Sequence, residues 1–254
     1  MTIIKLRGIL TAIVSLSIGA AVQAAPIVND NVRPITVNAA YSGEKSLQSV
    51  LDQLFGTGAV DASTDQSTAG IWGSATGAPA TTIPTLIIEQ TSGASSQKFG
   101  IWFGTDTGNL LMVDLFYGGA VGDPSGRSAA GLYLDAGYLQ IDRSGPQANC
   151  GTQINCTTII DSRIDPYSFG FYFTSGSTTA YSIDSLAGPN SRTRFLAYQH
   201  GATTNWAFAF EDGSDFDYQD MVVKVESIKV PLPGTVALLG IGLVGAGLLR
   251  RSRK

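Results

Sequence analysis

Short runs of aromatic and β-branched residues recur along most of this chain, and they constrain its fold more than any other feature. Nine of them follow one another: IPTLIIEQ, KFGIWFG, NLLMVDLFYG, GLYLDAGYLQI, SFGFYFT, TAYSIDS, RTRFLAYQ, NWAFAFED and DMVVKVESIKV. Gly, Ser, Asp, Asn or Pro separates most of these runs, which is typical of β-strands joined by turns. The pattern predicts a mainly β chain, folded as an antiparallel β-sandwich or a jelly-roll-like domain.

Two of the runs alternate strictly between large and small or polar side chains. Phenylalanines at 169, 171 and 173 alternate with Gly170 and Tyr172, and aromatic rings alternate with alanines over residues 206–210. Successive side chains of a strand point to opposite faces of its sheet. The alternation therefore predicts antiparallel sheets with one face on the core.

One segment near the N-terminus has helical rather than strand spacing. Its apolar residues recur three and four positions apart: Leu47, Val50, Leu51, Leu54 and Phe55. This spacing predicts an amphipathic helix packed on a sheet. Ser42 is the expected N-cap, Glu44 is expected in the first turn, and Gly56 or Gly58 is expected to end the helix.

The first 24 residues have the layout of a secretory signal peptide. Lys5 and Arg7 precede an apolar stretch, Gly8–Val22, and small residues then lead to Ala24. This order predicts export through the Sec machinery and cleavage after Ala24, whereas an N-terminal core helix would not explain it.

The C-terminal residues raise a second question of membrane contact. Fourteen small or apolar residues, Val236–Leu249, end at a basic cluster that includes Arg250 and Arg251. They could form a membrane span, a buried helix or a label that is removed. A span needs roughly 20 apolar residues, and a buried helix would not normally end in such a cluster. We therefore expect a short transmembrane sorting helix that anchors the chain transiently, with its basic end in the cytoplasm.

The residues before this stretch make the tail specific. Pro231, Leu232 and Pro233, followed by a glycine-rich apolar segment and basic residues, resemble the PEP-CTERM sorting signal of Gram-negative bacteria. Leu232 stands where that signal usually has Glu, as in a known VPLP variant. The resemblance implies recognition by an exosortase-type enzyme and delivery to the cell surface or the exopolysaccharide matrix.

These assignments divide the chain into a signal peptide (1–24), one β-sandwich-like domain (25–229) and a sorting signal (230–254). The middle part holds all 20 acidic residues and ten basic ones, a formal charge of −10. Such a charge repels nucleic acid and anionic membranes, so calcium or cationic surfaces are better candidate partners.

The chain has two cysteines, Cys150 and Cys156, separated by five other residues. In an oxidising compartment such a pair predicts a local disulfide. A metal site is the alternative, but no histidine or third cysteine is near in sequence.

A cluster of carboxylates lies between the last two predicted strands. Its members fall within ten residues: Glu211, Asp212, Asp215, Asp217 and Asp220. Carboxylates this close repel one another, and a hard cation such as calcium, with six to eight oxygen ligands, relieves the repulsion. The alternative is a solvated acidic hairpin, since Asp and Gly favour turns. The spacing is not that of an EF-hand.

The same cluster carries a second resemblance. Residues 211–220, together with SFGFYFTSGSTTAYSIDSL (168–186), are similar to an uncharacterised β-rich domain family of bacterial surface and matrix proteins. This resemblance implies an extracellular structural or adhesive domain with no established activity.

Catalytic patterns are missing from the sequence. His200 is the single histidine, and no Gly-x-Ser-x-Gly element accompanies it. Common zinc ligand sets, Walker loops and dinucleotide fingerprints are also missing. A carboxylate-pair glycosidase stays open, because it needs only two acids. We predict a protein that is not an enzyme: a surface or biofilm-matrix protein in which calcium stiffens the strand junction near Asp217.

The alternative function is a carbohydrate-binding module of the extracellular matrix. Such modules stack sugars on exposed aromatic rings, and the candidates are Trp72, Trp102 and Trp206. Trp102 and Trp206 lie in apolar strands and are expected in the core. Trp72 lies in a glycine-rich loop and is the ring expected to be exposed to extracellular polysaccharide.

Overall fold

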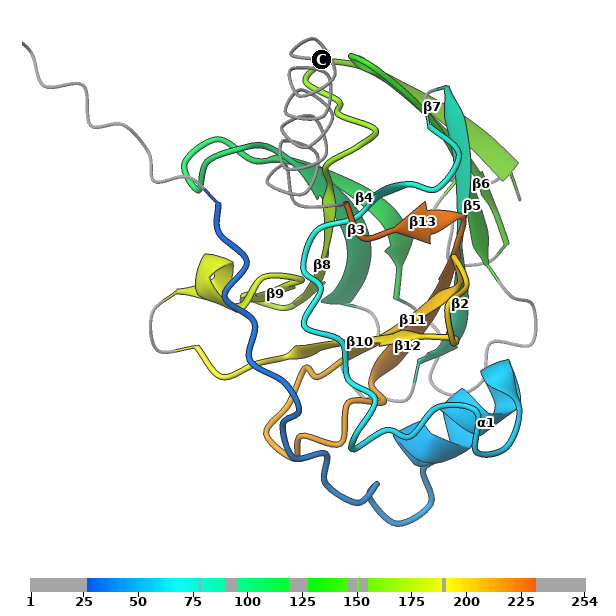
Figure 1. Ribbon diagram of the computed structural model, residues 1–254, viewed down its shortest axis with the longest axis vertical. Coiled ribbons are helices and arrows are strands. Elements are labelled where there is room, and N and C mark those ends of the chain that lie inside the picture. Colours follow the sequence, from blue (N-terminus) through cyan, green and yellow to red (C-terminus); the bar gives the residue numbers. More distant parts are fainter. Residues whose placement is uncertain are drawn as a thin grey trace, which may run out of the picture.

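The protein is described by a computed structural model that covers residues 27–77, 79–89, 96–118, 128–145, 150, 155–188 and 191–231. These ranges contain helix α1 (Leu47–Phe55), the 3-10 helix η3 (Asp184–Ala187) and β-strands (Figure 1). The strands are β1 (Gly73–Ser74), β2 (Ala80–Glu89), β3 (Gln97–Phe103), β4 (Leu111–Tyr117), β5 (Ala129–Asp135), β6 (Tyr138–Ser144), β7 (Asn155–Asp161), β8 (Gly170–Ser175), β9 (Thr178–Tyr181), β10 (Phe195–Gln199), β11 (Trp206–Phe210), β12 (Met221–Glu226) and β13 (Ile228–Lys229). Within these ranges, the prediction of a mainly β chain with an amphipathic helix before the strands is confirmed.

Two large sheets account for most of the strands. One sheet has the order β10-β11-β12-β2-β5-β6-β7, and the other has the order β4-β3-β8-β9. Strands β1 and β13 form a separate two-stranded pair. All recorded pairings are antiparallel, as the sequence predicted.

The two large sheets share one core of aromatic side chains. Phe171 of β8 lies 4.7 Å, between ring centroids, from Phe208 of β11, and Phe173 lies 5.0 Å from Phe210. All four rings are buried in the same cluster. Complete burial of one such side chain contributes about 1.5–3 kcal/mol. These contacts pack the sheets face to face as two layers.

The opposite face of the larger sheet is covered over β10–β12, where the helix that the sequence predicted to pack on a sheet lies. Ala207 and Ala209 belong to a second buried cluster with Val50 and Leu51 of α1. The alternation in β11 is therefore real, but both of its faces are buried. Small alanine side chains on this face leave room for the helix to lie against the sheet.

The start of α1 differs from the predicted one. Ser46 is the N-cap, and its side chain accepts a hydrogen bond from the Ser49 N–H at 3.2 Å. Ser42 and Glu44 therefore precede the helix, because the first helical residue is Leu47. Gly56 ends the helix with a φ of 99°, as the sequence predicted; this left-handed backbone favours glycine.

The predicted signal peptide with its cleavage site at Ala24 lies outside the described residues, and so does the predicted sorting helix with Leu232, Pro233, Arg250 and Arg251. Among the described residues, no helix is both long enough and apolar enough to cross a membrane.

Candidate cation site

The acidic cluster occupies the connection between two paired strands. Phe210, the last residue of β11, pairs with Met221, the first residue of β12, so residues 211–220 leave the sheet and return to it. In Figure 1 this orange connection lies beside the blue N-terminal segment. The backbone N–H of Asn38 donates to the Phe216 carbonyl at 2.9 Å. The connection is thus attached to a distant part of the chain.

Two aromatic residues anchor the middle of this connection. Phe216 and Tyr218 have positive φ angles of 57° and 59°, a conformation that costs a non-glycine residue roughly 1–2 kcal/mol. Both rings are buried in the cluster beneath α1, and the Tyr218 hydroxyl donates to the Thr193 carbonyl at 2.8 Å. Ring burial offsets the backbone cost and holds the intervening Asp217 in place.

The structure brings Glu211, Asp215 and Asp217 together. Each offers one carboxylate oxygen, and the three oxygens lie within 4.8 Å of one another. Glu211 and Asp217 are 0 % and 1 % exposed, while Asp215 reaches solvent. We call these three residues the first triad. It combines two buried acids with one that is open to ions in solution.

The hydrogen bonds of the first triad leave one oxygen unsatisfied. Glu211 Oε1 accepts from the Gly213 N–H at 2.7 Å, and Asp217 Oδ2 accepts from Gln219 Nε2 at 2.8 Å. The other oxygen, Asp217 Oδ1, is buried and has no hydrogen-bond partner within the described part of the chain. A buried oxygen without a partner is costly, on the order of 1–3 kcal/mol and more when it is charged. The site therefore lacks a group that would bind this oxygen.

The electrostatics of Glu211 point the same way. Burial, together with the nearby Asp215 carboxylate, raises the pKa of Glu211 to about 7. In the absence of a positive charge, the triad favours a proton on this residue. A bound cation would favour the ionised carboxylate instead.

Glu211 also belongs to a second triad, with Asp212 and Asp220. Burial, with the charges of Asp212 and Glu211, raises the pKa of Asp220 to about 9. Asp220 Oδ2 accepts from the Asp212 N–H at 2.6 Å, and Asp212 Oδ2 accepts from Gln97 Nε2 at 2.7 Å. Because Gln97 begins β3, these bonds tie the acidic connection to the smaller sheet.

All five predicted carboxylates thus lie in two triads that share Glu211. Sequence reasoning missed the residues that support them. Glu44 was expected in the first turn of α1, but its Oε2 instead accepts from Gln219 Nε2 at 2.8 Å. Asn38 donates through its side chain to the Asp215 carbonyl. No local pattern marks these residues, because each lies more than 170 positions from its partner.

The donor set of the first triad suits a hard cation. It consists of oxygen atoms, which calcium and magnesium prefer, and it has no sulfur or imidazole of the kind that favours zinc or copper. The unsatisfied Asp217 Oδ1 is available as a ligand. The residues present could therefore hold a hard cation.

The comparison with protein families concerns the C-terminal residues of the chain. Residues 229–254 match the model of the PEP-CTERM protein-sorting motif. The chain carries a PEP-CTERM motif. No curated protein and no solved structure is similar enough to this chain to count as a match.

The PEP-CTERM motif begins where the folded body ends. Lys229, the first matched residue, is the last residue of β13 and pairs with Gly73 of β1. Its Nζ donates to the Ala75 carbonyl at 3.1 Å. The β1–β13 pair is thus the last paired part of the described chain before the sorting segment. The motif implies export, association with the cell envelope and recognition by an exosortase-type enzyme.

The position of Trp72 corrects one prediction. Trp72 is 0 % exposed, and its ring centroid lies 4.9 Å from that of Phe208. The loop turns inward because the backbone of Trp72 pairs with that of Phe169. The expected exposure is wrong, so this ring cannot serve as a platform for sugars. Trp102 and Trp206 are buried as predicted.

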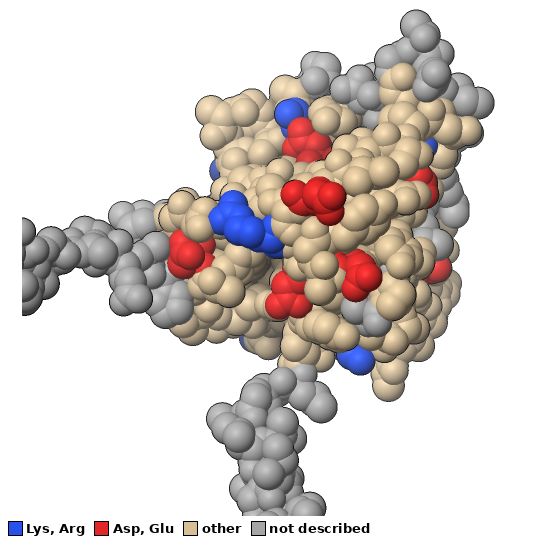
Figure 2. Space-filling view, turned by 90° about the horizontal axis from the view of Figure 1, so that it is seen from above, with Lys and Arg blue, Asp and Glu red and all other residues tan. Residues whose placement is uncertain are grey.

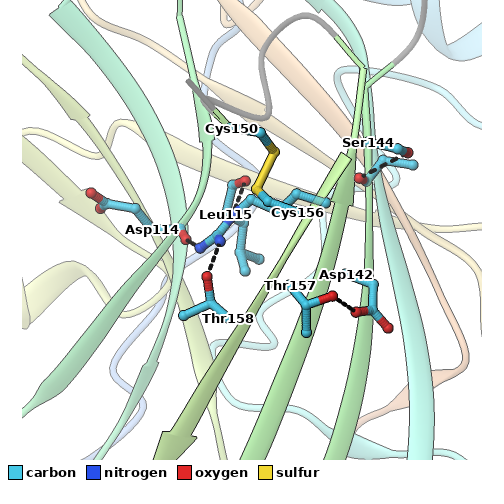
Figure 3. Close-up of a disulfide and its surroundings, with 10 residues drawn as sticks. Asp114, Leu115, Asp142, Ser144, Cys150, Cys156, Thr157 and Thr158 are labelled. Carbon is cyan, nitrogen blue, oxygen red and sulfur yellow. Dashed lines mark hydrogen bonds between the residues drawn. A yellow bond between two sulfur atoms is a disulfide. The ribbon is translucent and has the colours of Figure 1, made fainter. Parts of the chain in front are cut away.

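The disulfide between Cys150 and Cys156 is present in the structure (Figure 3). Cys156 lies on β7, at the edge of the larger sheet, so the bond fastens Cys150 to that strand. Nearby, Arg143 donates to Thr158 Oγ1 at 2.7 Å and to the Leu115 carbonyl at 3.2 Å. This part of the molecule connects the edges of the two sheets.

His200 packs against the helix. Its ring is stacked on Phe55 of α1, with centroids 4.9 Å apart. This contact places His200 beside the last turn of α1.

Proposed function

We propose that this chain is an exported, non-catalytic protein of the cell surface or exopolysaccharide matrix, and that its body binds calcium at the first triad. The PEP-CTERM motif supports sorting by the C-terminal tail. The observation that carries the calcium site is the buried, unsatisfied Asp217 Oδ1 beside the oxygens of Glu211 and Asp215.

The alternative of a solvated acidic hairpin does not account for this burial. A turn that is acidic only for local reasons would expose its carboxylates to water. Glu211 and Asp217 are instead almost completely buried, and a buried charge is retained when it is paired or coordinates a metal. The rest of the acidic charge lies elsewhere: Figure 2 shows acidic side chains in separate places over one face rather than in a continuous patch.

Calcium also agrees with the place to which the tail directs the protein. Extracellular modules bind calcium with dissociation constants of roughly 10⁻⁴–10⁻³ M. Backbone carbonyls and water would complete the six to eight ligands that calcium requires. Bound calcium would link Glu211, Asp215 and Asp217 and so hold the β11–β12 connection in its folded conformation.

The test is thermal unfolding of the exported protein in excess calcium and in EGTA. A ligand that binds only the folded state at 100 times its dissociation constant adds about 2.7 kcal/mol. For a domain of this size, each kcal/mol raises Tm by about 2–4 °C, so we expect Tm to rise by roughly 5–10 °C with calcium.

Asp217→Asn should abolish the rise, because the amide removes a charged ligand while it keeps the size of the side chain. Asp161→Asn, at an exposed position of β7, is the matched control and should preserve the rise. An unchanged Tm in EGTA, or an equal rise in Asp217→Asn, would contradict the calcium site.

A further inference from the structure

A cavity of about 340 Å³ lies between the smaller sheet and the segment that leads into β10. Its walls come from β9, from η3 and from residues 191–194. Because β9 and β10 are the outer strands of their sheets, the cavity lies at an edge of the two-layer body. Its size falls at the small end of the range for ligand pockets, about 300–1,000 Å³.

Hydroxyl groups are prominent in the lining of this cavity. They belong to Ser177, Thr178, Thr179, Tyr181, Ser191 and Thr193. Each hydroxyl can donate and accept a hydrogen bond. A lining of this kind suits a ligand that itself carries many hydroxyl groups.

Two arginines add positive charge to the cavity. The guanidinium carbon of Arg192 lies 3.4 Å from the centroid of the Phe216 ring. At this distance the guanidinium group lies over the face of the Phe216 ring in a cation–π contact. A guanidinium group can bind a carboxylate bidentately. Arg194 also lines the cavity, and its Nη1 donates to the Gly213 carbonyl at 2.7 Å.

The single acid in the lining is already paired. Asp184 forms a salt bridge with Arg33 at 2.7 Å and accepts from Thr193 Oγ1 at 2.9 Å. It therefore does not cancel the charge of Arg192 and Arg194. In a body with a formal charge of −10, Arg192 and Arg194 thus make the lining of this cavity locally basic.

We propose that this cavity binds a hydroxylated carboxylate of the hexuronic acid class, as a residue of an acidic polysaccharide. Arg192 binds the carboxylate, and the Ser and Thr hydroxyls bind the ring hydroxyls. The site is independent of the buried Trp72, and its chemistry does not require a cation.

Titration calorimetry of the exported protein with matched ligands tests the proposal. D-galacturonate and D-galactose differ at one carbon, which carries a carboxylate in the first and a hydroxymethyl group in the second. An oligogalacturonate distinguishes a polymer from a free sugar acid, and inorganic phosphate tests for a general anion site. Each titration is run in calcium and in EGTA, so that a result on the cation site does not decide this one.

We expect galacturonate, its oligomer or both to bind, and galactose to bind at least roughly tenfold more weakly, since a hydrogen bond to a charged group contributes about 1.5–3 kcal/mol. Arg192→Gln should weaken binding by a similar factor. Arg163→Gln is the matched control, because Arg163 is also exposed but lines a different depression; it should leave binding unchanged.

Binding of the oligomer alone identifies a polymer as the ligand and supports the proposal. Equal binding of galactose or of phosphate, unchanged binding by Arg192→Gln, or no binding in either buffer overturns it. A melting curve of Arg192→Gln is the control for folding. We expect it to match that of the unmodified protein, since this side chain lies on the surface.

Discussion

Glu211 is the carboxylate that the two acidic triads share, and its protonation links pH to stability. In the folded protein without a cation, burial and Asp215 raise its pKa to about 7, above the ordinary value of 4.5. The folded state therefore binds this proton more tightly than the unfolded state. Stability from this residue is complete below about pH 4.5 and is lost as the pH rises through about 7.

We therefore expect Tm in EGTA to fall between pH 5 and pH 8, because Glu211 lowers the free energy of unfolding by about 1–3 kcal/mol over this range. Saturating calcium should remove most of this fall, because the cation replaces the proton. Glu211→Gln should make the fall in EGTA smaller, since its amide does not titrate, while Asp220, whose pKa is raised to about 9, keeps its own contribution to the fall. A profile of Glu211→Gln that matches the unmodified protein would refute this assignment.

At the scale of single elements, two glycines of the smaller sheet leave space for aromatic rings of the neighbouring strand. Gly100 of β3 pairs with Tyr172 of β8, and Gly170 pairs with Trp102. A Cβ atom at Gly100 would overlap the Tyr172 ring, and one at Gly170 would overlap the Trp102 ring. Each glycine thus provides the space that its cross-strand partner fills.

Gly100→Ala should destabilise the protein by about 1–3 kcal/mol, because added volume in a packed site forces its neighbours to shift. Gly131→Ala is the control: Gly131 is also within a strand, β5, but its added Cβ would meet its nearest atom at 3.8 Å. Chemical denaturation should show a large loss for the first variant and little change for the second. Equal effects would mean that strand propensity, not contact with Tyr172, decides the cost.

At the scale of the whole molecule, the folded body ends with the short β1–β13 pair, and the sorting segment follows it. Ile228 is buried in the main core, and the PEP-CTERM motif begins at the next residue. Cleavage after Pro231 would therefore leave Ile228 and the main core cluster intact.

We expect the mature protein from its native host to lack Arg250–Lys254. Its folded body should unfold with the same melting curve as the folded body of the full chain. Intact-mass measurement checks the first point. A mature mass that retained these residues would show that the tail is not removed.

Local patterns in the sequence indicated most of the strands, though not β1 or β7, and they determined which residues alternate along β8 and β11, which cysteines pair and where the sorting segment begins. They could do so because strand periodicity, close cysteine spacing and a contiguous motif each depend on neighbouring residues. The five acids of residues 211–220 were also identifiable, since they are adjacent in sequence.

Only the tertiary structure decided which side chains are buried and which residues support the acidic site. Trp72 is buried because its loop pairs with Phe169, and Glu44 supports Asp217 through Gln219, which lies 175 positions away. Both faces of β11 are covered because α1 lies against its alanines. Burial depends on segments that the fold brings together from distant parts of the chain, and the periodicity of a single strand carries no record of them.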